Sequence, residues 1–232
     1  MPRLEPVALS LVALPVVLAL GWWLFVQTEG VYLGARVVRW LYDRSALEYD
    51  EIKEFDNEAD DRHLGQPLSE RLAGDEQACV LDVGTGTARL PLTLFRHLDF
   101  KGRVVGLDSS RAMLDVAVAK TVFFSESVDL VENDAKVLPF RPAAFDAVAC
   151  IEVLEFLPSV AGALCEMVRV LKPGGTLVVS NRRGLDRWTF PGRAFAAADF
   201  EKQLRSLGLT HVATYRWLTY YELIWAEKEQ AG

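Results

Sequence analysis

Hydrophobic positions run without interruption near the start of the chain, at residues 7–26. The stretch VALSLVALPVVLALGWWLFV holds no charged residue in 20 positions. An apolar helix of about 20 residues matches the hydrocarbon thickness of a bilayer, and Trp22 and Trp23 lie near one end, where indole rings favour the interface. The pattern predicts a retained transmembrane anchor. A cleaved signal peptide, whose apolar region is usually shorter, and a buried core helix are the alternatives.

The residues that follow this stretch are basic and amphipathic. One arginine, Arg3, precedes the apolar run, whereas Arg36, Arg39 and Arg44 follow it. The positive-inside rule therefore predicts a single-pass membrane protein whose C-terminal domain is cytoplasmic. Residues 31–42, VYLGARVVRWLY, have the pattern of an amphipathic helix. This helix either lies on the membrane surface or packs on the domain.

Acidic residues dominate the next segment, 43–61. Nine Asp and Glu residues stand there against Arg44 and Lys53, so the segment's net charge of −7 equals that of the whole chain. Such a run is typical of a solvated helix face. Anionic lipid would repel it, so we expect the segment to stand off a membrane surface. The acidity of the chain argues against nucleic acid as a partner, because phosphates attract clustered Lys and Arg.

From residue 78 onward, short apolar runs alternate with helical patterns. The pattern predicts helices at 88–98, 109–122 and 160–171, and strands at 78–84, 102–108, 128–134 and 176–181 and from residue 145. This alternation predicts a parallel sheet with helices on both faces. The runs 211–218 and 220–228 have no helix between them, and they predict an antiparallel hairpin at one edge of the sheet.

The stretch VLDVGTGTAR, residues 80–89, turns sharply after its strand. Gly84 and Gly86 allow a tight turn and a close approach of the backbone to a ligand. A dinucleotide fingerprint needs glycine or alanine where Arg89 stands, and the sequence has no phosphate-binding P-loop. We therefore expect a nucleoside-like ligand without a pyrophosphate group.

Three acids mark the same edge of the predicted sheet. Asp82 lies in the first strand, and Asp108 and Asp134 end the second and third. Ligands of open parallel sheets bind beyond the carboxyl ends of the strands, and a carboxylate there suits the hydroxyls of a ribose. The three histidines and three cysteines show no metal-ligand spacing, so no metal site is expected.

Four motifs, all within residues 43–182, carry a resemblance to a known family. They are VLDVGTGTARL, VVGLDSSRAMLDVA, ENDAKVLPFRPAAFDAV and EMVRVLKPGGTLVVSN, in this order. The chain resembles the class I S-adenosylmethionine-dependent methyltransferases, and more narrowly the small-molecule branch with the ubiquinone/menaquinone-type enzymes. The resemblance implies S-adenosylmethionine as cofactor and an α/β fold: a Rossmann-like, doubly wound, seven-stranded sheet with a C-terminal antiparallel hairpin, beside the N-terminal transmembrane helix.

The resemblance also implies cofactor contacts in the first two loops. Gly84 and Gly86 would pack against the methionine and ribose portions. Asp82 would orient the methionine amine, directly or through water. Asp108 would accept both ribose hydroxyls.

Further contacts follow from the third and fourth strands. By the same resemblance, Asp134 would face the adenine amino group, with Ala135 and Met113 near the ring. Ile151 and Glu152 would border the sulfonium and its methyl group.

The sequence departs from the family pattern at two places. Ala88 stands where the family usually has a third glycine, which should tighten the turn. The segment after the fourth strand has no histidine, so the resemblance supplies no catalytic base. If the acceptor must lose a proton, the candidates are Glu152, Glu155 and Tyr49. An exposed helix position is the alternative for Glu155.

In the family, the region before the first strand packs over the cofactor. We expect Tyr49 to line the active site in this way, together with Arg182, Arg183 and Trp188 after the fifth strand. The two arginines would favour an acceptor with an acid or phosphate group. Alternatively, they are surface residues that contact water or lipid headgroups.

These patterns predict three regions: an anchor at 1–28, juxtamembrane and lid helices at 29–74, and a cofactor-binding domain at 75–232. The expected function is that of a membrane-anchored methyltransferase. Its acceptor would be small or lipophilic, such as a quinone precursor or a lipid headgroup. A non-catalytic binding or scaffolding protein and a protein methyltransferase remain alternatives, because a fold alone does not fix a function.

Overall fold

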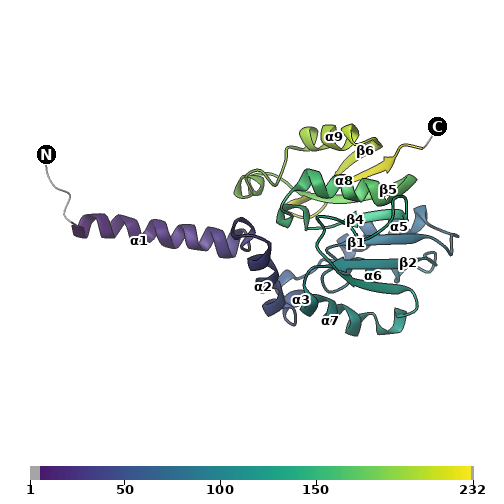
Figure 1. The fold of residues 1–232 in the computed structure, drawn as a ribbon, viewed down its shortest axis with the longest axis horizontal. Coiled ribbons are helices and arrows are strands. Elements are labelled where there is room, and N and C mark those ends of the chain that lie inside the picture. The colour runs from purple at the N-terminus through teal and green to yellow at the C-terminus, as the bar shows by residue number, and fades with distance from the viewer. Residues whose placement is uncertain (1–5, 231–232) are drawn as a thin grey trace.

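The computed structural model describes residues 6–230 and is built around one sheet (Figure 1). The sheet has seven strands in the order β3-β2-β1-β4-β5-β7-β6. The strands are β1 (Cys79–Val83), β2 (Arg103–Asp108), β3 (Val128–Glu132), β4 (Phe145–Cys150), β5 (Leu171–Arg182), β6 (Leu209–Arg216) and β7 (Tyr221–Lys228). The first five pair in parallel, and β7 runs antiparallel to both β5 and β6.

Helices cover both faces of this sheet. The helices are α1 (Pro6–Trp22), α2 (Ala35–Ser45), α3 (Tyr49–Lys53), α4 (Asn57–Asp60), α5 (Gln66–Arg71), α6 (Arg89–Leu94), α7 (Arg111–Lys120), α8 (Val160–Val170) and α9 (Ala197–Ser206). Successive side chains of a strand point to opposite faces. Accordingly, Leu81 and Val83 pack with α8 and α9, whereas Val80 packs with α5 and α6.

The predicted parallel sheet with a C-terminal antiparallel hairpin is confirmed. The sequence analysis did not predict α9, which lies between β5 and β6. Its buried face is narrow: Phe200 and Leu204, one turn apart, are fully buried, while the polar residues between them face outward. Two large apolar positions in ten residues are a weak signal for a helix.

The N-terminal segment differs from the prediction. Among residues 6–230, no helix combines the length and the apolar character needed to cross a membrane. The structure therefore does not support the spanning helix predicted at residues 7–26, nor the predicted single-pass localisation and membrane anchoring. Arg3, used in the orientation argument, lies outside the described residues.

The end of the apolar run belongs to the domain. The α-helix stops at Trp22, and Trp23–Gln27 form a π-helical turn. The Trp23 indole stacks on Tyr32 at a centroid distance of 5.0 Å and donates to the Thr189 carbonyl at 3.2 Å. The helix α1, of 17 residues, projects away from the domain beyond this point (Figure 1).

The amphipathic segment 31–42 packs on the domain, which was one of its two predicted placements. It begins with a 3-10 turn, Val31–Leu33, and continues as α2 after Gly34. Helix α2 contacts α7, and one face of α2 closes the cavity described next.

Candidate functional site

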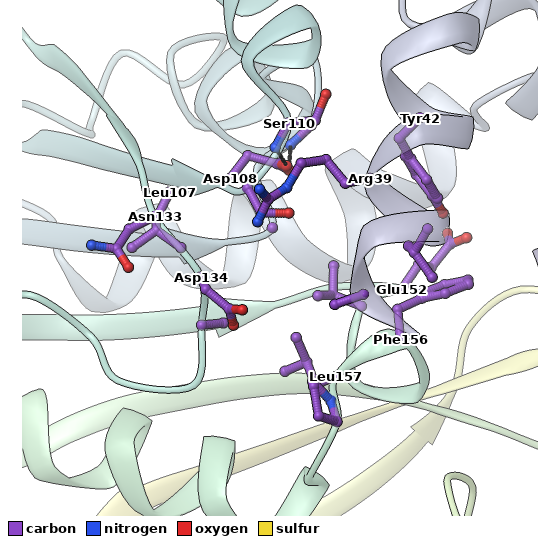
Figure 2. A pocket seen from close by; sticks show the side chains of 18 of the residues that line it. Arg39, Tyr42, Leu107, Asp108, Ser110, Asn133, Asp134, Glu152, Phe156 and Leu157 are labelled. Carbon is purple, nitrogen blue, oxygen red and sulfur yellow. Dashed lines mark hydrogen bonds between the residues drawn. The ribbon is translucent and has the colours of Figure 1, made fainter. Parts of the chain in front are cut away.

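A cavity of about 110 Å³ lies beyond the carboxyl ends of β1, β2 and β4 (Figure 2). The loops after these strands form its floor, and α2 forms one wall. A smaller cavity of about 30 Å³ adjoins it on the β1 side; Gly84, Gly86, Tyr49, Ile151 and Glu152 line both. This is the position at which open parallel sheets bind ligands.

The loop after β1 has the conformation that its glycines predict. Gly84 and Gly86 adopt φ values of 76° and 54°, in the left-handed region. A Cβ at Gly84 would lie 2.4 Å from a Val153 methyl carbon, so only glycine fits there. Ala88, where the family usually has glycine, also adopts a left-handed φ of 70°, at a cost of about 1–2 kcal/mol.

Asp108 is fixed by backbone donors. Its Oδ2 accepts the Gly86 N–H and its Oδ1 accepts the Ser110 N–H, both at 2.9 Å. Burial raises the pKa of Asp108, and these N–H donors oppose the shift. Each carboxylate oxygen keeps a second lone pair for a further donor, and the residue lines the cavity.

Asp82 lines the smaller cavity and is 3% exposed. Burial raises the pKa of its carboxyl to about 7. No arginine or lysine forms an ion pair with it among residues 6–230. A cationic amine placed beside Asp82 would therefore find a carboxylate without a competing partner.

Most of the predicted cofactor residues meet at this place. Asp134 and Ala135 line the main cavity, as Ile151 does from the end of β4. Met113 does not line either cavity: it is fully buried, and its N–H donates to the Ser110 hydroxyl at the start of α7.

Glu152 combines backbone strain with a fixed side chain. Its φ is 57°, and its N–H donates to the Ser180 hydroxyl at 2.6 Å. The Arg89 guanidinium donates to Glu152 at 2.7 Å through Nη1, and to both carboxylate oxygens of Asp60 at 2.7 Å through Nε and Nη2. Burial opposes the charge of Arg89, but its hydrogen bonds to Asp60 and the charge of Glu152 raise its pKa further. Strain of this kind is typical of functional positions.

Tyr49 lies where the lid prediction placed it, against Gly86 and Glu152 in both cavities. Burial and then the charge of Glu152 raise the pKa of Tyr49 well above its usual range, so its hydroxyl keeps its proton. A raised pKa makes Tyr49 a poor base near neutral pH. Its ring lies 5.7 Å from that of Tyr42, and Tyr42 lies 5.9 Å from Phe156.

The acidic segment 43–61 is only partly a solvated face. Three of its acids instead bind the loops of the site, in the pairs Asp43 with Ser110, Asp50 with Thr87 and Lys120, and Asp60 with Arg89. These hydrogen bonds and ion pairs hold the segment over the carboxyl edge of the sheet.

Four predicted site residues do not reach the cavity. Glu155 is 2% exposed and accepts hydrogen bonds from Arg182 Nε and the Tyr221 hydroxyl, so neither the catalytic role nor the exposed position holds for it. Arg182 is buried and also pairs with Asp186 at 2.7 Å. Arg183 and Trp188 do not line the cavity, and Trp188 is 71% exposed. Neither arginine lines the cavity, and Arg182 is paired with two carboxylates, so the structure does not support the predicted arginine contact with an anionic acceptor.

Sequence reasoning missed the contribution of α2. Ala35, Val38, Arg39 and Tyr42 line the cavity at spacings of three and four residues, and Phe156 faces them from the loop after β4. The helical period was visible in residues 31–42. It did not show which face would meet the site.

Comparison with known proteins agrees with this geometry. A methyltransferase-domain family model matches residues 81–179. A demethylmenaquinone methyltransferase of Tropheryma whipplei is 30% identical over 196 residues, which are 83% of this chain and 79% of that protein. The chain belongs to the class I S-adenosylmethionine-dependent methyltransferases, in their quinone-type branch. The predicted enzyme class and cofactor are thereby confirmed for the family of this chain.

Two further matches mark the limits of the likeness. A demethylmenaquinone methyltransferase of Staphylococcus epidermidis is 45% identical over 98 residues. The match therefore spans about 40% of that relative's length. The crystal structure of the cyclase SpnF matches with a TM-score of 0.71 at 23% identity, over 85% of this chain and 97% of that one. At this identity the match shows the fold alone.

Proposed function

We propose that this chain transfers a methyl group from S-adenosylmethionine to a small aromatic acceptor of the quinone type. The observation that carries the proposal is the ring-lined end of the cavity, where Tyr42, Tyr49 and Phe156 surround the approach to Glu152. Rings arranged in this way give a flat acceptor a stacking surface. The relatives named demethylmenaquinone methyltransferases support the same class of acceptor.

The residues at the cavity fit S-adenosylmethionine. Asp108 has free lone pairs for two ribose hydroxyls, and Asp82 forms no ion pair within residues 6–230. We assign Asp108 to the ribose and Asp82 to the methionine amine. Gly86 leaves its backbone open for the close approach of the ligand, since a Cβ there would meet only Tyr49, at 3.7 Å, whereas Gly84 lets Val153 pack against the loop.

The other half of the main cavity suits the base of the nucleoside. We assign Asp134 and Ala135 to the adenine, and Ile151 to the border of the methionine portion. Met113 has an indirect role: its N–H donates to the Ser110 hydroxyl, and its side chain is buried and does not line the cavity.

The bound cofactor supplies an activated methyl group, so the protein's task is mainly alignment. A phenolic or hydroquinone acceptor must also lose a proton. Glu152 is the base we propose, since Arg89 and the strained backbone hold its carboxylate at the cavity wall. Tyr49 keeps its proton and donates a hydrogen bond to the acceptor oxygen, and the surrounding rings keep water out.

The test uses the full chain with methyl-labelled S-adenosylmethionine and a short-chain naphthohydroquinone that lacks the ring methyl group. We expect one methyl group per acceptor, measured by mass spectrometry. The oxidised quinone has no hydroxyl proton and serves as the negative control.

Other outcomes would replace the proposal. Label on phosphatidylethanolamine would indicate a lipid-headgroup acceptor, and label on added proteins would indicate a protein methyltransferase. Binding of the cofactor without transfer to any acceptor would favour the non-catalytic binding protein.

A further inference from the structure

Helix α2 presents one face to the adenosine half of the cavity. Ala35, Val38, Arg39 and Tyr42 lie on this face, because residues three and four apart lie above one another on a helix. Ala35 is small, Val38 is apolar and Arg39 is cationic. These three residues stand opposite Asp108 and Asp134. Arg36, one turn before Arg39, does not line the cavity.

Arg39 is the only positively charged residue among the described residues that line the main cavity. Three acids line it as well: Asp108, Asp134 and Glu152. Figure 2 shows the Arg39 side chain reaching across the cavity toward Asp108 and Ser110. The protein places a guanidinium over the part of the cavity whose floor we assign to ribose and adenine.

The other arginines near the site are committed to partners. Arg89 holds Asp60 and Glu152, and the guanidinium of Arg44 lies 5.4 Å from the centre of the Trp40 ring. Arg39, in contrast, has no hydrogen bond or ion pair with any of the residues 6–230. Within the described part of the chain it is an unpaired cation at the ligand cavity.

We propose that Arg39 is an adenine-recognition residue that closes on the cofactor. Its planar guanidinium would stack on the exposed face of the adenine ring while Asp134 and Ala135 meet the ring edge. A guanidinium stacks well on aromatic faces, and the attraction grows when water is excluded. This inference rests on the cofactor site of the proposed function, and it does not depend on the acceptor.

The methionine carboxylate is a less suitable partner for Arg39. Asp82, which we assign to the methionine amine, lines only the smaller cavity, together with Arg89. Arg39 lines only the main cavity, beside Ser109, Ser110 and Asn133.

The test is calorimetric titration of the full chain, without acceptor, with S-adenosylmethionine and with 5′-methylthioadenosine. The second ligand has the adenosine half but no amino acid. Arg39→Ala should weaken the binding of both ligands by about tenfold, which lies between the values for an exposed and a desolvated cation–π contact. Arg39→Lys should lose part of this affinity, since it keeps the charge without the plane. Arg36→Ala is the matched control and should bind both ligands like the wild type.

Three results would overturn the role of Arg39. They are unchanged affinity of Arg39→Ala, an equal loss in Arg36→Ala, and a loss confined to S-adenosylmethionine, which would place Arg39 on the carboxylate. If the wild type bound neither ligand, the proposed function itself would fail. Equal thermal midpoints of the variants exclude unfolding as the cause of a loss.

Discussion

Two buried arginines organise different parts of the molecule with the same chemistry. Arg89 holds Asp60 and Glu152 and lies against the rings of Phe55 and Trp217, at 4.2 and 5.0 Å. We call these five residues the Arg89 cluster. The Arg89 side chain at its centre is 14% exposed, and one of its carboxylates opens onto the ligand cavity.

The second group, the Arg182 cluster, consists of Arg182, Glu155, Asp186, Phe190 and Tyr221. Arg182 donates to the two carboxylates at 2.7 Å, and the two rings lie 4.1 and 4.8 Å from its guanidinium carbon. None of these five residues lines the cavity.

The difference lies in what the second carboxylate of each cluster faces. Glu152 meets the cavity, so the Arg89 cluster can act on a ligand. In the Arg182 cluster, Asp186 instead accepts a hydrogen bond from Gln27, which ties the end of the N-terminal segment to the domain. Two carboxylates around an arginine therefore indicate a buried ionic cluster, and only exposure to a cavity distinguishes a chemical role from a structural one.

The largest effect should come from Arg182→Met. It leaves the buried Glu155 without a cation, and breaking a buried ion pair costs about 3–5 kcal/mol. Urea unfolding measures the free energy of unfolding. Arg183→Met, in which only a 3.4 Å hydrogen bond to Thr219 is lost, is the control and should change it by less than about 0.5 kcal/mol. A loss below about 1 kcal/mol in Arg182→Met would show that the cluster is not structural.

Glu152→Gln tests the other cluster. The amide oxygen can still accept from Arg89, so the fold should keep its stability. The loss of the base should lower single-turnover methyl transfer to the hydroquinone by about 100-fold, the lower end of the range for acid–base catalysis. Binding of S-adenosylmethionine should change little. An unaltered transfer rate would assign the Arg89 cluster to structure, like its counterpart.

The fold was predictable because its signals are local. Strand and helix periods, the glycine turn at residues 84–86 and the acids at the strand ends lie within single motifs, and parallel strands necessarily bring those ends together. Most of the proposed cofactor site, including Asp82 and Asp108, could therefore be predicted. Ala135 and Ile151 came from the family resemblance alone.

The ionic clusters were not predictable from local spacing. Asp60 lies 29 residues from Arg89, and Glu155 lies 27 residues from Arg182, so each pair forms only when the tertiary fold is complete. The acidic run 43–61 gave no sign of which acids would turn inward. The apolar run 7–26 matched a membrane span in composition, but the packing of Trp23 and Gln27 on the domain is a tertiary contact.

Asp82 is a buried carboxylate that belongs to neither cluster. Burial raises its pKa to about 7 from 3.8. Its contribution to stability is therefore full below about pH 4 and is lost as the pH rises through 7. Binding of the cofactor's ammonium group requires the ionised form, so the affinity for S-adenosylmethionine should rise about tenfold between about pH 6 and pH 8. Calorimetric titration over this range measures it. Asp82→Asn should remove the pH dependence, and a persistent rise in that variant would assign it to another group.

The smallest effects should come from one matched pair of substitutions, Tyr49→Phe and Tyr221→Phe. Each removes a single buried hydroxyl and keeps the ring, a change of about 1 kcal/mol. Tyr221 donates to Glu155 inside the Arg182 cluster, so its loss should lower the free energy of unfolding and leave methyl transfer unchanged. Tyr49 lines the cavity beside Glu152, so its loss should slow methyl transfer about fivefold and leave unfolding unchanged. Urea unfolding and single-turnover transfer, measured on both variants, give four values. If Tyr221→Phe slowed transfer as much as Tyr49→Phe did, the two clusters would be coupled, and the division between a chemical and a structural cluster would fail.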